Sequence, residues 1–129
     1  MAEASAALRS QVRERAGGKC EYCLIPEVQS LVGHEIDHIV ALKHGGQTAM
    51  ENLALCCTIC NKHKGSDLAS IDPGTGELQP LFHPRQDRWL DHFDLQHGEI
   101  VPLTAAGRAT VRLLRLNRPE RIQERRMPG

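Results

Sequence analysis

Hydrophobic positions recur at helical spacing near both ends of the chain. Leu8 and Val12 lie four residues apart, Ser5 can cap the first turn, and a glycine pair follows. This pattern predicts a helix over about residues 5–16. A second run with apolar side chains at helical spacing starts at a threonine and ends before an Asn-Arg-Pro sequence, which predicts a helix over residues 104–116.

The middle of the chain has shorter patterns. Residues 28–32 and 35–42 are rich in β-branched side chains and are separated by Gly33-His34, so we expect them to form a two-stranded ribbon. Residues 61–64 are expected to lie in a short helix that ends near the following glycine. The Asp-Pro-Gly-Thr-Gly sequence at 72–76 predicts a turn.

Large side chains are scarce in this sequence. Aromatic residues make up 3% of it, and three of the four, Phe82, Trp89 and Phe93, lie within twelve positions of one another. The first eighty residues therefore lack the bulky side chains of a self-sufficient core, and another stabilising element is expected there. The three clustered aromatics are expected to pack against that part of the chain; stacking on nucleic-acid bases is the alternative.

The length of 129 residues favours one domain, residues 1–129. No apolar run reaches the roughly 20 residues that a bilayer crossing requires. The N-terminal segment carries charges where a signal peptide would need an apolar stretch. We therefore expect a cytoplasmic protein without a membrane partner.

The five cysteines are placed in an informative pattern. Cys20 and Cys23 form one CxxC pair, Cys57 and Cys60 form a second, and Cys56 is left over. An odd count argues against a disulfide framework, whereas two CxxC pairs are typical of a tetrahedral zinc site. A thioredoxin-like redox pair is the alternative, but no flanking βαβ pattern is present. Cys56 could replace Cys57 as a ligand, although the tighter spacing favours Cys57.

Charge is balanced overall but unevenly distributed. The chain has 16 basic and 16 acidic residues, yet seven arginines and only two glutamates fall within residues 104–129. This asymmetry indicates a basic face that could follow a phosphate backbone. A solvated helix with internal salt bridges is the competing interpretation.

An ordered set of polar residues lies between and just after the cysteine pairs. The chain contains Glu35-Ile36-Asp37-His38-Ile39-Val40, then Gly45-Gly46, then Asn52-Leu53, and then Cys57-Thr58-Ile59-Cys60-Asn61-Lys62-His63-Lys64-Gly65. In this order and spacing the elements closely resemble the HNH endonuclease family. The resemblance covers about residues 19–65.

The resemblance implies a fold as well as an activity. It predicts an α+β protein built on a small ββα-metal module, treble-clef-like, in which a strand pair and a helix hold one catalytic divalent ion. Zinc held by the two cysteine pairs would stabilise this module. An N-terminal helix would precede it, and a C-terminal extension over residues 80–129, with an arginine-rich helix, would follow.

The residue types fit phosphodiester hydrolysis. His38 can accept a proton from water, because imidazole is substantially neutral at physiological pH. Asp37 and Asn61 offer the oxygen ligands that Mg²⁺ or Mn²⁺ prefers, and His63 is a possible substitute ligand. By resemblance alone, Asn52 fixes the loop that carries the base, and the products carry 5′-phosphate and 3′-hydroxyl ends.

Strand geometry limits this arrangement, because neighbouring strand residues point to opposite faces. Asp37 and His38 can serve one centre only at a strand end or a distortion. DNA is expected ahead of RNA as the substrate, and the sequence does not define the oligomeric state. Two other classes stay open: a catalytically silent, zinc-stabilised nucleic-acid or protein interaction module, and a thiol redox protein.

Overall fold

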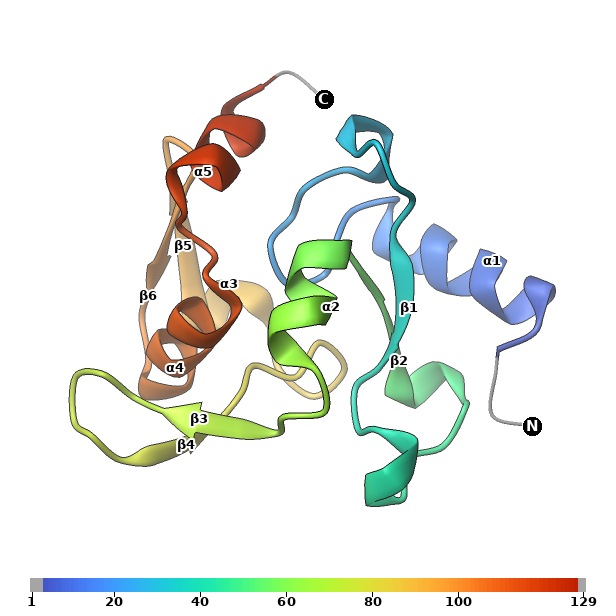
Figure 1. Cartoon of the computed structure of the whole chain (residues 1–129), viewed down its shortest axis with the longest axis horizontal. Coiled ribbons are helices and arrows are strands. Elements are labelled where there is room, and N and C mark those ends of the chain that lie inside the picture. The colour runs from blue at the N-terminus through green and yellow to red at the C-terminus, as the bar shows by residue number, and fades with distance from the viewer. Residues whose placement is uncertain (1–3, 128–129) are drawn as a thin grey trace.

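The computed structural model describes residues 4–127, which form five α-helices and three two-stranded antiparallel sheets (Figure 1). In chain order the helices and strands are α1 (Ala6–Ala16), β1 (Glu35–His38), β2 (Leu53–Cys56), α2 (Thr58–Lys64), β3 (Ala69–Ile71), β4 (Leu78–Pro80), α3 (Trp89–His92), β5 (Phe93–Gln96), β6 (Glu99–Pro102), α4 (Ala105–Leu114) and α5 (Pro119–Arg126). Short 3₁₀ turns occupy Glu27–Gln29, Leu42–His44 and Met50–Asn52. The predicted α+β class is confirmed.

Both helices predicted from capping residues are present. Ser5 accepts a hydrogen bond from the Leu8 backbone N–H at 3.1 Å, and α1 ends at Gly17, whose φ of 66° lies in the left-handed region that favours glycine. Thr104 caps α4 in the same way, through Gly107. Helix α4 ends two residues earlier than expected, and a separate helix, α5, follows it. Proline suits the first position of α5 because its missing N–H would have no helical partner there.

The predicted ribbon of residues 28–32 with residues 35–42 is wrong. Strand β1 covers only Glu35–His38, and it pairs with β2, so that Asp37 lies opposite Ala54 and His38 opposite Leu53. Residues 28–32 instead form a turn and a loop whose β-branched side chains are exposed. Burial explains the difference, because β2 is buried along its whole length and brings a continuous apolar surface to β1 that the exposed loop cannot supply.

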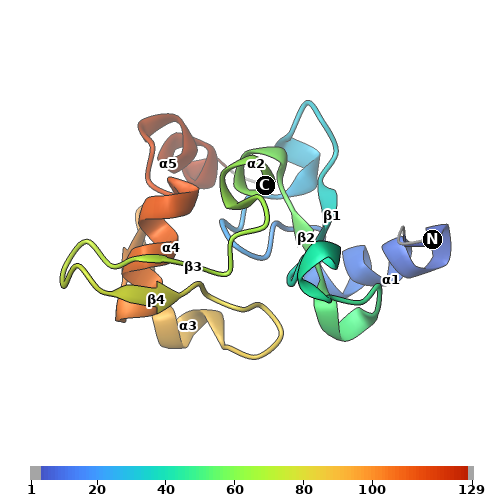
Figure 2. The ribbon, with the colours of Figure 1, turned by 60° about the horizontal axis from the view of Figure 1, so that its bottom comes forward.

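Helix α2 occupies the middle of the molecule. It lies between the β1–β2 hairpin on one side and α4 and α5 on the other, in both views (Figures 1 and 2). Helix α1 contacts β2 on the outer side of the hairpin, where Val12 packs with Leu53 and Leu55. The hairpin is therefore covered on one face by α1 and on the other by α2.

The described part of the C-terminal extension, residues 80–127, packs together with the β3–β4 hairpin that comes just before it. The predicted turn at 72–76 joins β3 to β4, and this hairpin lies beside α4 (Figure 2). Arg108 of α4 makes two 2.8 Å hydrogen bonds to the buried Asp72, and its guanidinium holds the pKa of that carboxyl well below its usual range. Strands β5 and β6 form a second hairpin that the sequence patterns did not predict.

The clustered aromatics join the extension to the cysteine-rich part of the chain, as predicted. Phe82 meets Tyr22 and Phe93 edge to face, with ring centroids 6.3 and 5.4 Å apart. The Trp89 indole N–H donates to the Tyr22 carbonyl at 3.0 Å. These rings share one buried cluster with the cysteines. Among the described residues, no helix combines the length and the apolar character that crossing a bilayer demands.

Candidate metal centre and active site

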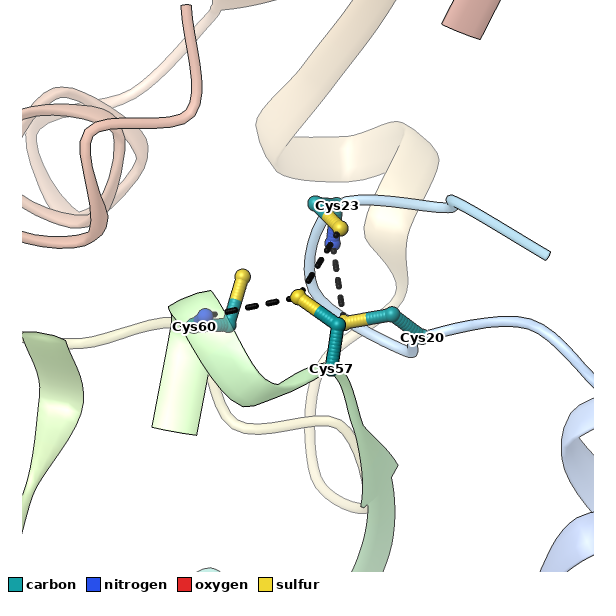
Figure 3. Close-up of side chains that lie close together, drawn as sticks. All are labelled: Cys20, Cys23, Cys57 and Cys60. Carbon is teal, nitrogen blue, oxygen red and sulfur yellow. Dashed lines mark hydrogen bonds between the residues drawn. The ribbon is translucent and has the colours of Figure 1, made fainter. Parts of the chain in front are cut away.

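The four cysteines of the two CxxC pairs converge in the buried core. Their sulfur atoms all lie within 4.8 Å of one another, and the Sγ atoms of Cys23 and Cys57 are 3.6 Å apart (Figure 3). Zinc–sulfur bonds of about 2.3 Å in a tetrahedron place the sulfurs about 3.8 Å apart. The four thiols therefore fit one zinc ion without rearrangement of the backbone.

The local backbone is already arranged to support thiolates. The backbone N–H of Cys23 points to the Cys20 sulfur at 3.5 Å, and that of Cys60 points to the Cys57 sulfur at 3.3 Å. Hydrogen bonding to the sulfurs of the other ligands holds the pKa of Cys57 well below the usual thiol range, whereas burial raises the pKa of Cys20, Cys23 and Cys60. N–H groups directed at sulfur stabilise the negative charge that zinc ligands carry.

Cys56 lies outside this cluster. Of the two cysteines that the sequence allowed as the third ligand, Cys56 and Cys57, the structure therefore selects Cys57. The buried Cys56 thiol donates to the Cys57 carbonyl at 3.4 Å. As the last residue of β2, it packs in the hydrophobic core next to the ligands. Cys56 therefore serves as a core side chain.

Asp37 points from β1 towards α2 and is almost completely buried. Its Oδ2 accepts a hydrogen bond from the Tyr22 hydroxyl at 2.9 Å and lies 3.2 Å from the Lys64 ammonium nitrogen, itself buried. Burial raises the pKa of Asp37 above its ordinary value, and the positive charge of Lys64 offsets part of that rise. Both partners contact Oδ2, so Oδ1 is the carboxylate oxygen left for another ligand.

Asn61 lies on the same side of α2 as Lys64, because residues three apart on a helix are neighbours. Since Lys64 contacts Asp37, this places Asn61 on the helix face that meets the end of β1. Lys64 also donates to the Ile39 carbonyl at 3.1 Å, which fixes the spacing between α2 and the segment after β1. His63 is turned away from this face, towards Arg115 and Arg118, whose charges help burial to lower its pKa.

His38 is the last residue of β1, the strand-end position that a shared centre requires. Its partly exposed imidazole makes a 2.9 Å hydrogen bond through Nε2 with the Thr48 hydroxyl. His38 lines a surface groove together with Arg9 and Arg13 of α1, on the α1 side of the hairpin, whereas the Asp37 carboxylate faces Lys64 of α2, so the structure does not direct the two side chains to one point. His38 is also near enough to Asp37 to favour the charged form of that carboxylate.

Asn52 holds the loop that follows His38. Its Oδ1 accepts from the Val40 N–H at 2.9 Å, and its Nδ2 donates to the Val40 and Gln47 carbonyls at 3.0 and 2.8 Å. Gly46 is required beside it, because a Cβ at that position would lie 1.8 Å from the Val40 carbonyl oxygen. One amide side chain thus clamps both ends of residues 40–47.

Replacing Asn52 with alanine is expected to lower the free energy of unfolding by about 2–3 kcal/mol, roughly 1 kcal/mol for each hydrogen bond lost. Asn52→Asp should cost nearly as much, since it keeps the acceptor but loses both donors and brings an anion near two carbonyls. Denaturant unfolding of the two variants and the wild type measures this. A change within about 0.5 kcal/mol, usual for a surface residue, would show that the clamp is dispensable.

Several residues around this site have no local sequence signal. Thr48 and Tyr22 contact the candidate catalytic side chains, yet each looks like an ordinary loop or turn residue in the sequence; Lys64 belongs to the motif, but nothing in the sequence indicates its contact with Asp37. Only the pairing of β1 with β2 and the placement of α2 bring them together. A correct prediction of that pairing would have been needed to find them.

Residues 20–67 match the family model described as HNH endonuclease. This segment contains both cysteine pairs, the β1–β2 hairpin and the whole of α2. Comparison with curated proteins and with solved structures gave no match. The family match covers just over a third of the chain and leaves the C-terminal extension outside it.

Proposed function

We propose that this protein is a metal-dependent nuclease that hydrolyses phosphodiester bonds, with DNA as its substrate, because residues 20–67 match the HNH endonuclease family model. The observation that best supports catalysis is that the side chains at the end of β1 are held in place by hydrogen bonds. Asp37 and His38 are each held by a dedicated side-chain partner, and Asn52 clamps the loop behind them.

In this proposal His38 is the general base. In the tautomer that this role requires, Nε2–H donates a hydrogen bond to the Thr48 hydroxyl, which fixes the imidazole ring and leaves Nδ1 to take a proton from water. General bases of this kind contribute about 10²–10⁴-fold to a rate. Asn52 is a positioning residue, since it holds residues 40–47 without touching the imidazole.

Asp37 and Asn61 would hold the catalytic Mg²⁺ or Mn²⁺. Oδ1 of Asp37 and the amide oxygen of Asn61 are hard oxygen ligands on facing elements. Within residues 4–127 no second group of three or more cysteine, histidine or carboxylate ligands comes together, so the site has few protein ligands, as magnesium sites often do. When bound, such an ion neutralises charge on the phosphoryl oxygens. Lys64 keeps the carboxylate oriented through Oδ2.

The nucleic acid would also contact part of the C-terminal extension. Four of the seven arginines expected to form a basic face are instead used internally: Arg108 bonds to Asp72, and Arg121, Arg125 and Arg126 bond to backbone carbonyls. The other three are exposed and join Lys62 of α2 in what we call the basic surface: Lys62, Arg112, Arg115 and Arg118.

Two features of the basic surface favour a phosphate partner. Arg115 is exposed, and its guanidinium forms no ion pair with any described residue. Arg118 has a single ion-pair partner among the described residues, the exposed Glu120 at 3.8 Å, a weak contact in water. Both guanidinium groups thus stay available to an external anion.

Replacing Arg115 and Arg118 together with glutamine should weaken DNA binding and reduce its dependence on salt. Each lost phosphate contact lowers the slope of log affinity against log salt concentration by about 0.9 for duplex DNA. Fluorescence anisotropy in EDTA, over a salt series, measures binding without cleavage. Arg88→Gln, an exposed arginine at the start of α3, is the matched control. An unchanged slope in the double variant would remove this surface from the interface.

The test of the proposed function is cleavage of supercoiled plasmid by purified protein with Mg²⁺ or Mn²⁺, and with EDTA. Metal-dependent conversion to the nicked or linear form is the expected result. Binding of the same plasmid without conversion under all metal conditions would identify a silent interaction module instead. A parallel reaction with a structured RNA tests the preference for DNA.

A further inference from the structure

We propose that Arg121, in the C-terminal extension, is an outer-sphere component of the zinc centre that offsets the charge of its thiolates, so that metal retention and the docking of α5 depend on each other. The inference rests on the four-cysteine site and not on nuclease activity. It assigns a metal-related role to a residue that lies well outside the segment matched by the family model.

The Arg121 guanidinium reaches into the cysteine cluster from the first turn of α5. Its Nη2 donates to the Cys60 sulfur at 3.0 Å and to the Cys57 sulfur at 3.4 Å. Its Nη1 donates to the Leu114 and Arg115 carbonyls at 2.8 and 3.3 Å, where α4 ends. One planar side chain therefore joins two metal ligands to the carboxyl end of a helix.

Burial makes this arrangement demanding. Arg121 is 0% exposed, and it is the largest fully buried side chain among the described residues. A guanidinium does not lose its proton in a protein, so its charge must be compensated where it lies. No carboxylate of the described residues forms an ion pair with it, and the helix end supplies only partial negative charge. The groups in contact with Arg121 that can carry a full negative charge are the thiolates of Cys57 and Cys60.

The zinc centre has the complementary need. Four thiolates around one divalent ion leave an excess of two negative charges in a core that excludes water. A cation donating to two of the sulfurs offsets part of that excess and holds the ligands in place, as outer-sphere partners do in other metal sites. The positive charge of Arg121 and the excess negative charge of the thiolates therefore stabilise each other in the core, and neither is stable there without the other.

Arg125, one helical turn later, provides a matched comparison. It also anchors α5, through the Gly98 and Leu116 carbonyls and the Asn117 side chain, but it makes no hydrogen bond to a cysteine. Replacing Arg125 with methionine loosens α5 and removes a charge that lies near Cys23 and Cys60 but donates to neither sulfur. Arg121→Met removes the charge that donates to the sulfurs, with similar volume, and Arg121→Lys keeps a positive charge with fewer donors.

The first test is the rate at which each zinc-loaded protein releases metal to a colorimetric chelator in excess. Arg121→Met should release zinc about 10- to 100-fold faster than the wild type, the usual effect of losing an outer-sphere partner. Arg121→Lys should fall between them, and Arg125→Met, which removes a nearby charge but no hydrogen bond to sulfur, should release zinc clearly more slowly than Arg121→Met. Equal rates for Arg121→Met and the wild type, or for the two methionine variants, would overturn the proposal.

The second test responds to hydrogen-bond donation from residue 121 to the sulfurs rather than to the packing of α5. In the cobalt-substituted protein, donation to sulfur stabilises the thiolate lone pairs and moves the sulfur-to-cobalt charge-transfer absorption to higher energy. This absorption should move to lower energy in Arg121→Lys, which keeps the fold but donates less well. An unchanged absorption would contradict the role assigned to Arg121.

The wild-type protein gives a third test, which holds even if Arg121→Met does not fold. Removing zinc should leave Arg121 without its counter-charges, so trypsin should cut after Arg121, Arg125 and Arg126 before it cuts after the arginines of α1, whereas general unfolding would expose both segments together. Restoring zinc should restore protection. Equal protection with and without zinc would show that α5 docks independently of the metal, against the proposal.

Discussion

Replacing His38 with alanine is expected to lower the rate of metal-dependent plasmid cleavage by about 10²–10⁴-fold, the contribution of a well-placed general base. The fold should tolerate the change, because His38 is the last residue of its strand, is partly exposed, and bonds to a single loop hydroxyl. Zinc content and the thermal unfolding midpoint should therefore stay close to those of the wild type. Initial rates of supercoiled-plasmid loss, measured at matched protein concentration, give the size of the effect.

Two further variants make this result specific. His44→Ala removes an exposed histidine six residues away and should leave the rate unchanged. Thr48→Val removes the hydroxyl that orients the imidazole and should lower the rate less than His38→Ala does. If the His38 variant cleaves as fast as the wild type, His38 is not the base. If only the Thr48 and His44 variants retain metal-dependent cleavage, the assignment is supported.

Removing zinc is expected to abolish the cooperative unfolding transition of the chain. Structural zinc sites in small domains contribute an apparent 10–16 kcal/mol at neutral pH, roughly as much as the 5–15 kcal/mol stability of a typical domain. The four cysteines sit in the same buried cluster as Tyr22, Phe82 and Phe93, so the loss should spread through the core. Thermal unfolding followed by circular dichroism, before and after chelation, measures it.

The neighbouring cysteines supply the control for this prediction. Cys60→Ser removes a ligand and should reproduce the effect of chelation, whereas Cys56→Ser changes a core thiol outside the cluster and should keep its bound zinc. Re-addition of zinc should restore the transition in the wild type but not in the Cys60 variant. A chelated wild type that unfolds at the same temperature as the zinc-loaded protein would contradict the structural role of the metal.

The sequence predicted those features whose causes lie within a few residues. The caps at Ser5 and Thr104 each satisfy a backbone N–H three residues away, so both helices could be identified from local pattern. The CxxC pairs behave in the same way, since each turn directs two sulfurs to one point. For these elements, short-range chemistry alone determines the structure.

The features that the sequence did not predict depend on contacts between residues that are far apart in the chain. The chain between residues 28 and 32 has strand-like composition, but β1 is selected by β2, which is buried and lies fifteen or more residues further along. The position of Arg121 could not be predicted either, because an arginine in an arginine-rich segment suggests solvent or phosphate. Its burial follows from long-range packing of α5 against the cysteines. The ligand set was therefore predictable, but its outer partners were not.

The separation of the two cysteine pairs along the chain has a consequence for the order of folding. The pairs are 33 residues apart, and the whole β1–β2 hairpin lies between them, so capturing the ion closes a loop that contains the hairpin. Closing such a loop has an entropy cost that grows only slowly with the length of the loop. The free energy of zinc binding offsets this cost. Arg121 is synthesised some sixty residues after the last ligand. During translation, the four cysteines therefore leave the ribosome and can bind zinc from solution before α5 has been synthesised and packs over them.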